Sequence, residues 1–217
     1  MKAEGSRHAK TLVFVAFGDS LTVGYQSPTA AEPSPEPAPY TRFLEAQVRR
    51  LLHGTAAETR AEFLNRGVNG ELTGEMALRF DRDALERAPD VVIILGGSND
   101  IGWGVEPPSI ARNLSGMYKQ ALKHGIRPVS CTIPSILGFD EGIPPRLELN
   151  QLIRITSEAL GVTCVDLFRA TSDSEGRLLS EYSNDGLHLN SAGYEAMAGA
   201  IFSGAVSDIV RDYIRAA

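Results

Sequence analysis

Five short apolar runs, separated by segments with helical periodicity, constrain the fold of this 217-residue chain more than any other feature. One run, Val91–Leu95, is apolar at every position, which is typical of a strand buried on both faces of a parallel sheet. The expected strands are residues 12–17, 61–64, 91–95, 128–133 and 162–165. The expected helices are residues 41–52, 71–87, 108–124, 146–160 and 191–215.

A strand followed by a helix, repeated along the chain, indicates a parallel sheet with helices on both faces. Because crossovers between parallel strands are right-handed, few topologies remain. We predict a flavodoxin-like three-layer α/β/α sandwich with a five-stranded parallel sheet in the order 2-1-3-4-5. The length suits a single domain over residues 1–217, with residues 1–10 as a flexible N-terminal segment.

The net charge of −6 argues against nucleic acids and anionic membrane surfaces as partners, because both favour clustered Lys and Arg. No apolar run approaches the roughly 18 residues of a membrane span. No signal segment is evident, so we expect a cytoplasmic protein for the chain as written, unless a leader was removed. Cys131 and Cys164 lack metal-ligand spacing, and we expect buried, reduced thiols. The oligomeric state stays open.

Two irregular segments, residues 27–39 and 134–145, follow expected strands. The first is too rich in proline to form a helix. Ligands bind at the carboxyl ends of strands in open α/β sheets, so both segments are expected to border a binding site. Long surface connections without such a role are the alternative.

A serine follows the first expected strand directly, in the sequence Gly18-Asp19-Ser20-Leu21. At the carboxyl end of a strand, Ser20 is positioned as a nucleophile if a base lies nearby. The candidate base is His188, which follows Asp185 at a spacing of three residues. This spacing lets the carboxylate reach Nδ1 of the imidazole, fix its tautomer and stabilise the imidazolium.

Hydrogen-bond donors follow the next two strands. The N–H of Gly70 can approach a ligand closely because glycine has no side chain. The side-chain amide of Asn99, at the end of the third strand, can donate toward the same point. Strands 1, 2 and 3 are neighbours in the predicted order, so these two donors and the Ser20 N–H would converge as an oxyanion hole.

Each of these residues also has a simpler structural interpretation when taken alone. Ser20 fits a helix N-cap and Gly70 a turn glycine. Asn99 fits an Asx-turn, and Asp185 fits an ordinary cap or turn residue. The combination of all of them favours the catalytic interpretation over the separate structural ones.

A non-catalytic flavodoxin-like module that binds phosphate or a divalent metal is the alternative from another functional class. Asp19, Asp100, Asp185 and His188 offer oxygen and nitrogen ligands for a metal. However, the chain lacks the glycine-rich loop with Lys and Ser or Thr that cradles phosphate. Asp19 and Asp100 are better interpreted as loop-ordering residues, so we expect no metal and no cofactor.

Four blocks, residues 18–21, 65–70, 97–100 and 185–188, resemble in sequence and order those of the SGNH hydrolases, also called the GDSL esterase/lipase family. Each block is a weak signal alone, whereas four in order, spanning nearly the whole chain, are a strong one. The resemblance implies Ser20 as nucleophile, His188 as base and Asp185 as its partner. It also implies an oxyanion hole from Ser20, Gly70 and Asn99, and a hydrolase that needs no metal.

The substrate implied by this resemblance is an ester, and we expect short acyl chains because no extended apolar stripe marks a lipid channel. Acetylated sugars, acyl thioesters and lysophospholipids are the alternatives within the family. The chain departs from the family pattern at Glu71, where an Asp is common in the family, and in the long proline-rich segment. These departures leave the acyl and alcohol specificity open. Tyr25, Trp103 and Phe139 lie near motif ends and are candidate pocket residues, with core packing as the alternative.

Overall fold

The computed structural model describes residues 11–53 and 59–216, so the expected flexible segment over residues 1–10 lies outside it. The strands are β1 (Thr11–Gly18), β2 (Arg60–Gly67), β3 (Val91–Leu95), β4 (Arg127–Cys131) and β5 (Thr163–Val165). The α-helices are α1 (Ser20–Val23), α2 (Tyr40–Leu52), α3 (Thr73–Asp83), α4 (Ser98–Gly102), α5 (Pro107–Lys123), α6 (Ile143–Leu160), α7 (Leu167–Thr171), α8 (Ser191–Ile201) and α9 (Ser207–Ala216). Shorter helical turns are η1 (Leu85–Arg87), η2 (Asp140–Gly142), η3 (Ser180–Tyr182) and the π-helical η4 (Phe202–Val206).

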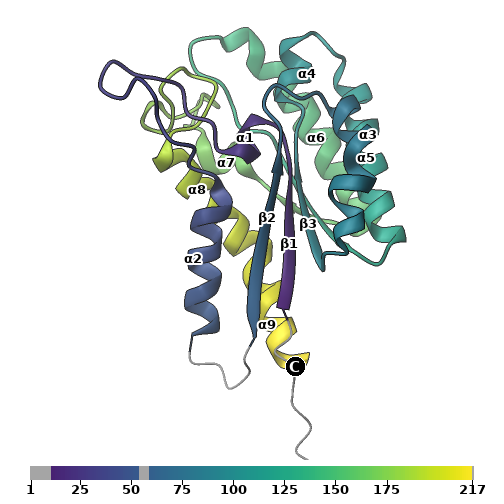
Figure 1. The fold of residues 1–217 in the computed structure, drawn as a ribbon. Helices are drawn as coiled ribbons and strands as arrows, with labels where there is room; N and C mark the ends of the chain where they lie inside the picture. Colours follow the sequence, from purple (N-terminus) through teal and green to yellow (C-terminus); the bar gives the residue numbers. More distant parts are fainter. Residues whose placement is uncertain (1–10, 54–58, 217) are drawn as a thin grey trace, which may run out of the picture.

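The strands are parallel and follow the order β2-β1-β3-β4-β5, which confirms the predicted topology. Gly18, at the end of β1, pairs with Gly67 of β2 and with Leu95 of β3. Three strands that are distant in the sequence therefore end level with one another. The polar motifs that follow them meet at one edge of the sheet (Figure 1).

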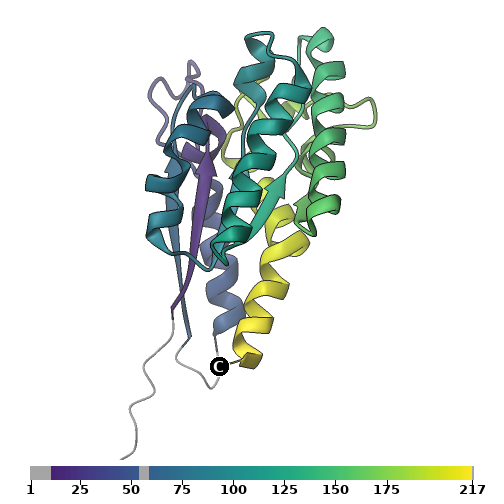
Figure 2. The same ribbon diagram turned by 90° about the vertical axis from the view of Figure 1, so that its right-hand side faces the viewer.

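Helices cover both faces of the sheet, which gives the three layers. α2, α8 and α9 pack on one face, and α3, α5 and α6 pack on the other (Figures 1 and 2). In the core, the rings of Phe17 and Phe80 meet edge to face with centroids 5.0 Å apart. Burial of one such side chain contributes about 1.5–3 kcal/mol. The core thereby holds the strand ends, and the motifs attached to them, in fixed positions.

The strand expected over residues 61–64 is longer in the structure and runs to Gly67. It lies at the edge of the sheet, and most of its residues are only partly buried. An edge strand needs no continuous apolar run, so a search for apolar residues finds only its middle. Asn65 and Arg66, expected in a loop, are therefore part of β2.

Three helices differ from the expected ones. The helix expected over residues 146–160 begins earlier, at Ile143, so the end of the segment 134–145, expected to be irregular, is helical and follows the 3-10 turn η2. The helix expected over residues 71–87 begins later, at Thr73, because the Glu75 carboxylate caps the N–H of Leu72 at 3.0 Å, and it gives way to a 3-10 turn after Asp83. The helix expected over residues 191–215 is interrupted by the π-helical turn η4, which a 3.6-residue periodicity does not anticipate. In the described part of the chain, no helix is both long and apolar enough to cross a membrane.

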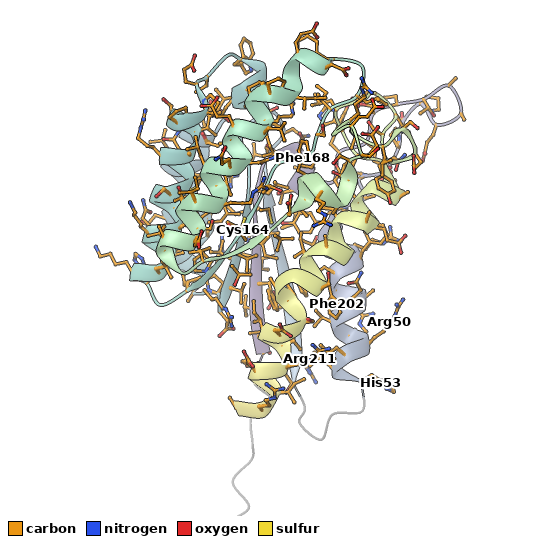
Figure 3. All side chains as sticks on the ribbon, turned by 180° about the vertical axis from the view of Figure 1, so that it is seen from behind. Arg50, His53, Cys164, Phe168, Phe202 and Arg211 are labelled. Atoms are coloured by element: carbon orange, nitrogen blue, oxygen red, sulfur yellow. The ribbon has the colours of Figure 1, made fainter. Side chains whose placement is uncertain are left out.

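Both cysteines are free thiols, as expected. Cys131 is buried in β4, and burial raises the pKa of its thiol well above the usual value. Cys164 lies on the edge strand β5 (Figure 3) and is only partly buried, so the expectation of a buried thiol is confirmed for Cys131 and only in part for Cys164. The raised pKa makes Cys131 a poor nucleophile at neutral pH.

Candidate active site

Ser20 begins α1 directly after β1, and the strand end presents it at the edge of the sheet. The turn is tight, because a Cβ on Gly18 would lie 2.2 Å from the carbonyl oxygen of Leu95, and only glycine fits. Asp19 is the N-cap of α1, since its Oδ1 accepts the N–H of Leu21 at 2.9 Å. Ser20 is therefore not the cap itself. The N–H groups in the first turn of a helix have no acceptor within the helix, so the Ser20 N–H is available for an acceptor from outside.

Asp19 is almost completely buried beside Ser20. Desolvation raises the pKa of its carboxyl group to about 7, although the hydrogen bond from Leu21 lowers it. Its Oδ2 is buried and has no hydrogen-bond partner among the described residues. A carboxyl group with this pKa carries a proton for part of the neutral pH range, which limits the negative charge next to the serine.

The imidazole of His188 is oriented by Asp185 in the loop before α8. Nδ1 of His188 lies 2.8 Å from Oδ2 of Asp185. An ionised carboxylate only accepts hydrogen bonds, so Nδ1 carries the proton and Nε2 is left as a base. Oδ1 of Asp185 accepts the backbone N–H groups of Leu187 and His188 at 2.9 and 2.7 Å. Asp185 thus orders the turn and aligns the imidazole with the same carboxylate.

The proline-rich segment supplies a further partner for Asp185. Ser27 Oγ donates to Oδ2, the oxygen that also faces His188, and Asn184 Nδ2 donates to the Ser27 carbonyl at 3.2 Å. Burial acts to raise the pKa of Asp185, but the hydrogen bonds from the side chains of Ser27 and His188 and from the two backbone amides outweigh it and hold the pKa well below its ordinary value. Residues 27–39 are irregular and border the site, as expected (Figure 1).

Two further donors lie beside the serine. Asn99 sits in the first turn of α4, not at the end of β3, and its Nδ2 donates to the carbonyl of Glu71 at 3.0 Å. The amide has a second N–H, which stays available for another acceptor. Gly70 has a φ of 74°, in the left-handed region that favours glycine. A Cβ on Gly70 would meet no atom within 4 Å, so the space beside it is open.

A nearly buried ion pair braces the segment before α3 against β1. Arg79 Nε donates to Oε1 of Glu71 at 2.6 Å, and Nη2 donates to Oε2 of the same carboxylate. Nη2 also donates to the carbonyl of Gly18 at 3.1 Å, and the guanidinium lies 4.1 Å from the centroid of the Phe17 ring. The pair thereby connects the turn that holds the serine with the carbonyl that holds Asn99. Sequence reasoning did not identify Arg79.

Five of the predicted site residues, Ser20, Tyr25, Gly70, Asn99 and His188, come together around one cleft of about 280 Å³. Its lining consists of Ser20, Tyr25, Asn69, Gly70, Asn99, Leu187 and His188. Within the described residues, no hydrogen bond joins Ser20 to His188 directly, although both line the cleft. The Tyr25 ring packs edge-on against the imidazole of His188, with centroids 4.6 Å apart. A hydroxyl, an oriented base and converging donors therefore share one small cleft.

A second cleft of about 460 Å³ adjoins the first, because Asn99 and Leu187 line both. Trp103 and Phe139, two of the three candidate pocket residues, are exposed and line this second cleft only. Residues of the irregular segment 134–145, including Phe139, form part of its wall, so this segment borders the site as expected.

The metal-binding alternative is not assembled in the part of the chain that the structure describes. Asp100 is buried and accepts the N–H and the hydroxyl of Thr73 at 3.0 and 2.6 Å, which ties α4 to α3. Asp19 caps α1, and Asp185 faces His188. Among residues 11–53 and 59–216, no three His, Cys, Asp or Glu side chains gather as ligands for an ion. The loop-ordering interpretation of Asp19 and Asp100 agrees with this geometry.

Sequence comparison identifies the family. The model of the GDSL-like Lipase/Acylhydrolase family matches residues 16–196. A curated protein of Bacillus subtilis (strain 168), named "Uncharacterized lipoprotein YqeF", is 32% identical over 131 residues. That match covers 57% of this chain and 49% of the relative, so the chain spans about half the length of the curated protein it matches.

Solved structures have the same fold. The lipase/acylhydrolase from Enterococcus faecalis superposes with a TM-score of 0.71 at 23% identity, covering 94% of this chain and 95% of that one. Axe2, an acetylxylan esterase from Geobacillus stearothermophilus, gives a TM-score of 0.68 at 20% identity, with 89% and 93% covered. At these identities, the likeness supports the fold and the sheet topology.

Proposed function

We propose that this chain, which belongs to the GDSL-like lipase/acylhydrolase family, is a hydrolase, and specifically a serine esterase that forms an acyl-enzyme on Ser20. The observation that carries the proposal is the shared cleft, onto which Ser20, His188, Gly70 and Asn99 converge. A nucleophile, a base, an orienting acid and oxyanion donors are the four parts that acyl transfer requires.

In the first half of the reaction, Nε2 of His188 takes the proton of the Ser20 hydroxyl while Oγ attacks the ester carbonyl carbon. Asp185 stabilises the resulting imidazolium through the hydrogen bond at Nδ1. The imidazolium then gives its proton to the alcohol oxygen as the ester C–O bond breaks. The products of this half are the free alcohol and an acyl ester on Ser20.

In the second half, a water molecule attacks the acyl ester while His188 takes its proton, and the carboxylic acid and the free Ser20 hydroxyl are released. Both halves pass through a tetrahedral oxyanion. The donors proposed for it are the N–H groups of Ser20 and Gly70 and the second N–H of the Asn99 amide. Loss of one such donor typically raises the barrier by about 2.7–4 kcal/mol.

The size of the cleft supports small acyl groups. A volume of about 280 Å³ lies at the lower end of the range for small-molecule sites. Acetyl esters of carbohydrates are included among the candidate substrates because a structure with this fold is an acetylxylan esterase. Thioesters and lysophospholipids require the same nucleophile, so they are further substrates to test with the same variant.

The experiment is hydrolysis of p-nitrophenyl esters from acetate to palmitate by the wild type and by Ser20→Ala, with acetylated xylooligosaccharide, an acyl thioester and a lysophospholipid in the same panel. Ser34→Ala, which changes an exposed serine of the proline-rich segment, is the matched control. We expect Ser20→Ala to lose roughly 10⁴-fold or more in kcat at unchanged thermal stability. We expect the control to retain full activity.

Near-wild-type turnover by Ser20→Ala would contradict the serine mechanism. Activity that EDTA abolishes would favour the metal-binding alternative instead. Turnover that is highest for acetate and falls with acyl length would support the small acyl pocket, whereas a maximum at palmitate would contradict it.

A further inference from the structure

Arg146 is a buried cation without an anionic partner. Its side chain lines the second cleft, and the residue is only 3% exposed. Nη1 donates to the carbonyl of Gly142 at 3.0 Å, whereas Nε is buried and has no hydrogen-bond partner among the described residues. Within the same residues, no carboxylate lies within ion-pair distance of the guanidinium. Burial of a charge in this state costs several kcal/mol unless something compensates it.

The position of Arg146 in α6 increases this cost. Arg146 lies in the first turn of α6, where the helix dipole presents partial positive charge, and that turn contains no acidic residue. Desolvation lowers the pKa of Arg146 to about 10, so the group still carries its charge at neutral pH. Asp140, just before the helix, is held by Arg177 at 2.8 Å. Glu141 lines the same cleft but is exposed, and its carboxylate forms no ion pair with Arg146. The local acidic residues therefore leave Arg146 uncompensated.

The cleft around Arg146 opens beside the catalytic one. Its lining includes residues of α4 and of the start of α6. These two helices contact each other (Figure 1). Asn99, the proposed oxyanion donor, and Leu187, next to the proposed base, line both clefts. Trp103 and Phe139 add exposed aromatic surface, which suits an apolar or ring-shaped body. A substrate held at the serine can therefore extend toward Arg146.

From these observations we infer that the second cleft binds a carboxylate carried by the ester substrate, with Arg146 as its partner and the two aromatic residues against the adjoining carbon skeleton. This inference rests on the proposed esterase function, since the catalytic cleft would hold the ester group itself. A guanidinium pairs with a carboxylate through charge-assisted hydrogen bonds. The carboxylate can belong to the acyl part or to the alcohol part, and both sources bring the same chemistry to Arg146.

Two pairs of esters, matched in their bodies, distinguish the sources. Phenyl acetate and 4-acetoxybenzoate differ by a carboxylate on the alcohol part. Phenyl hexanoate and monophenyl adipate differ by one at the end of the acyl part. We expect wild-type kcat/KM to favour the carboxylate member of one pair by about tenfold to a hundredfold, the value of a hydrogen bond to a charged group. Arg146→Met should abolish that preference by lowering kcat/KM for the carboxylate member toward that of the neutral member.

Three controls separate this role from a structural one. Arg112→Met, an exposed arginine on α5, should preserve the preference. Glu141→Gln should preserve or strengthen the preference for the carboxylate ester. A loss of the preference in this variant would show that Glu141 takes part in recognising the carboxylate, and would overturn the inference. Arg146→Met should unfold at the same or a higher temperature than the wild type, because removal of an unpaired buried charge is not destabilising in itself.

Binding tests the inference separately from hydrolysis. Benzoate and adipate should raise the unfolding temperature of Ser20→Ala but not that of the Ser20→Ala/Arg146→Met double variant. If the neutral esters are not hydrolysed but this difference is observed, the proposed function fails and the carboxylate site stands. If the neutral esters are hydrolysed with no carboxylate preference in either pair, or if Arg146→Met slows both members equally, the carboxylate site is wrong and the esterase stands.

Discussion

The brace between Glu71 and Arg79 gives a quantitative test of how the site is held. Their side chains are 8% and 10% exposed, and the pair is bidentate. Removal of one partner from a buried ion pair costs about 3–5 kcal/mol, because the other charge stays buried and uncompensated. Arg79→Met should therefore lower the free energy of unfolding by roughly 4 kcal/mol. For a chain of this length, that corresponds to a loss of about 8–16 °C in Tm.

A double-mutant cycle with Glu71→Gln separates this pair from the other contacts of Arg79. The double variant removes both charges, so it should be more stable than the sum of the single losses predicts, by about 0.5–3 kcal/mol. The cycle is measured by urea unfolding followed by circular dichroism. Arg82→Met is the matched control in the same helix, because the Arg82 side chain is 71% exposed and its ion pair with Asp83 should leave stability unchanged.

Activity provides the second readout of the brace. Arg79 donates to the Gly18 carbonyl, and the backbone carbonyl of Glu71 accepts the Asn99 amide. We therefore expect loss of the pair to displace Ser20 and Asn99, two parts of the proposed oxyanion hole. We expect kcat of Arg79→Met to fall by roughly tenfold with little change in KM, which is the signature of an interaction made in the transition state. Additive losses within about 0.5 kcal/mol, together with an unchanged kcat, would refute the reasoning.

The remaining predictions concern two carboxyl groups of the site. Ser27→Ala removes a donor from Oδ2 of Asp185, one of the contacts that lower the pKa of that carboxyl group, so the carboxylate should align the His188 imidazole less firmly. We expect kcat to fall with little change in KM and to recover in Ser27→Thr, whereas an unchanged kcat would contradict this role. Burial raises the pKa of the Asp19 carboxyl group from 3.8 to about 7, so folding favours its protonated form. The stability that Asp19 contributes is therefore fully present below about pH 4 and is lost as the pH rises to 7. This loss in the free energy of unfolding is about 4 kcal/mol at most. Asp19→Asn should remove this slope in urea unfolding measured between pH 4 and 8, and parallel curves for the two proteins would disprove it.

The sheet order could be predicted from the sequence because it depends on local signals and one handedness rule. The central strands β1 and β3 contain long apolar runs, as in Val91–Leu95, and right-handed crossovers leave few strand orders. The polar end of β2 could not be predicted in this way, since Asn65 and Arg66 belong to a partly exposed edge strand. Asn65 is held there by a long-range contact, because its Nδ2 donates to the carbonyl of Thr22 at 2.6 Å.

The convergence of Ser20, Gly70 and Asn99 on one cleft could also be predicted, because these residues follow three strands that are neighbours in the sheet. The supporting residues could not. Ser27 and Asp185 are 158 positions apart, and no pattern in the sequence connects them. Arg79 stands among other charged residues of α3, and nothing in the helical spacing distinguishes the one that turns inward. Such partners are selected by packing between segments, which a periodicity does not encode.

Two buried ionisable groups, Asp19 beside Ser20 and Arg146 in the second cleft, each carry a polar atom that lacks a partner among the described residues. The two groups respond to burial in different ways. Asp19 can shed its charge, since its raised pKa of about 7 allows it to hold a proton near neutral pH. Arg146 cannot do so, because a pKa of about 10 still leaves the guanidinium charged. Protonation removes the cost of a buried charge at Asp19 without any other molecule. The charge of Arg146 persists, so its compensation needs an anion from outside the described chain. That difference is why we assign a ligand to Arg146 and only a pH dependence to Asp19.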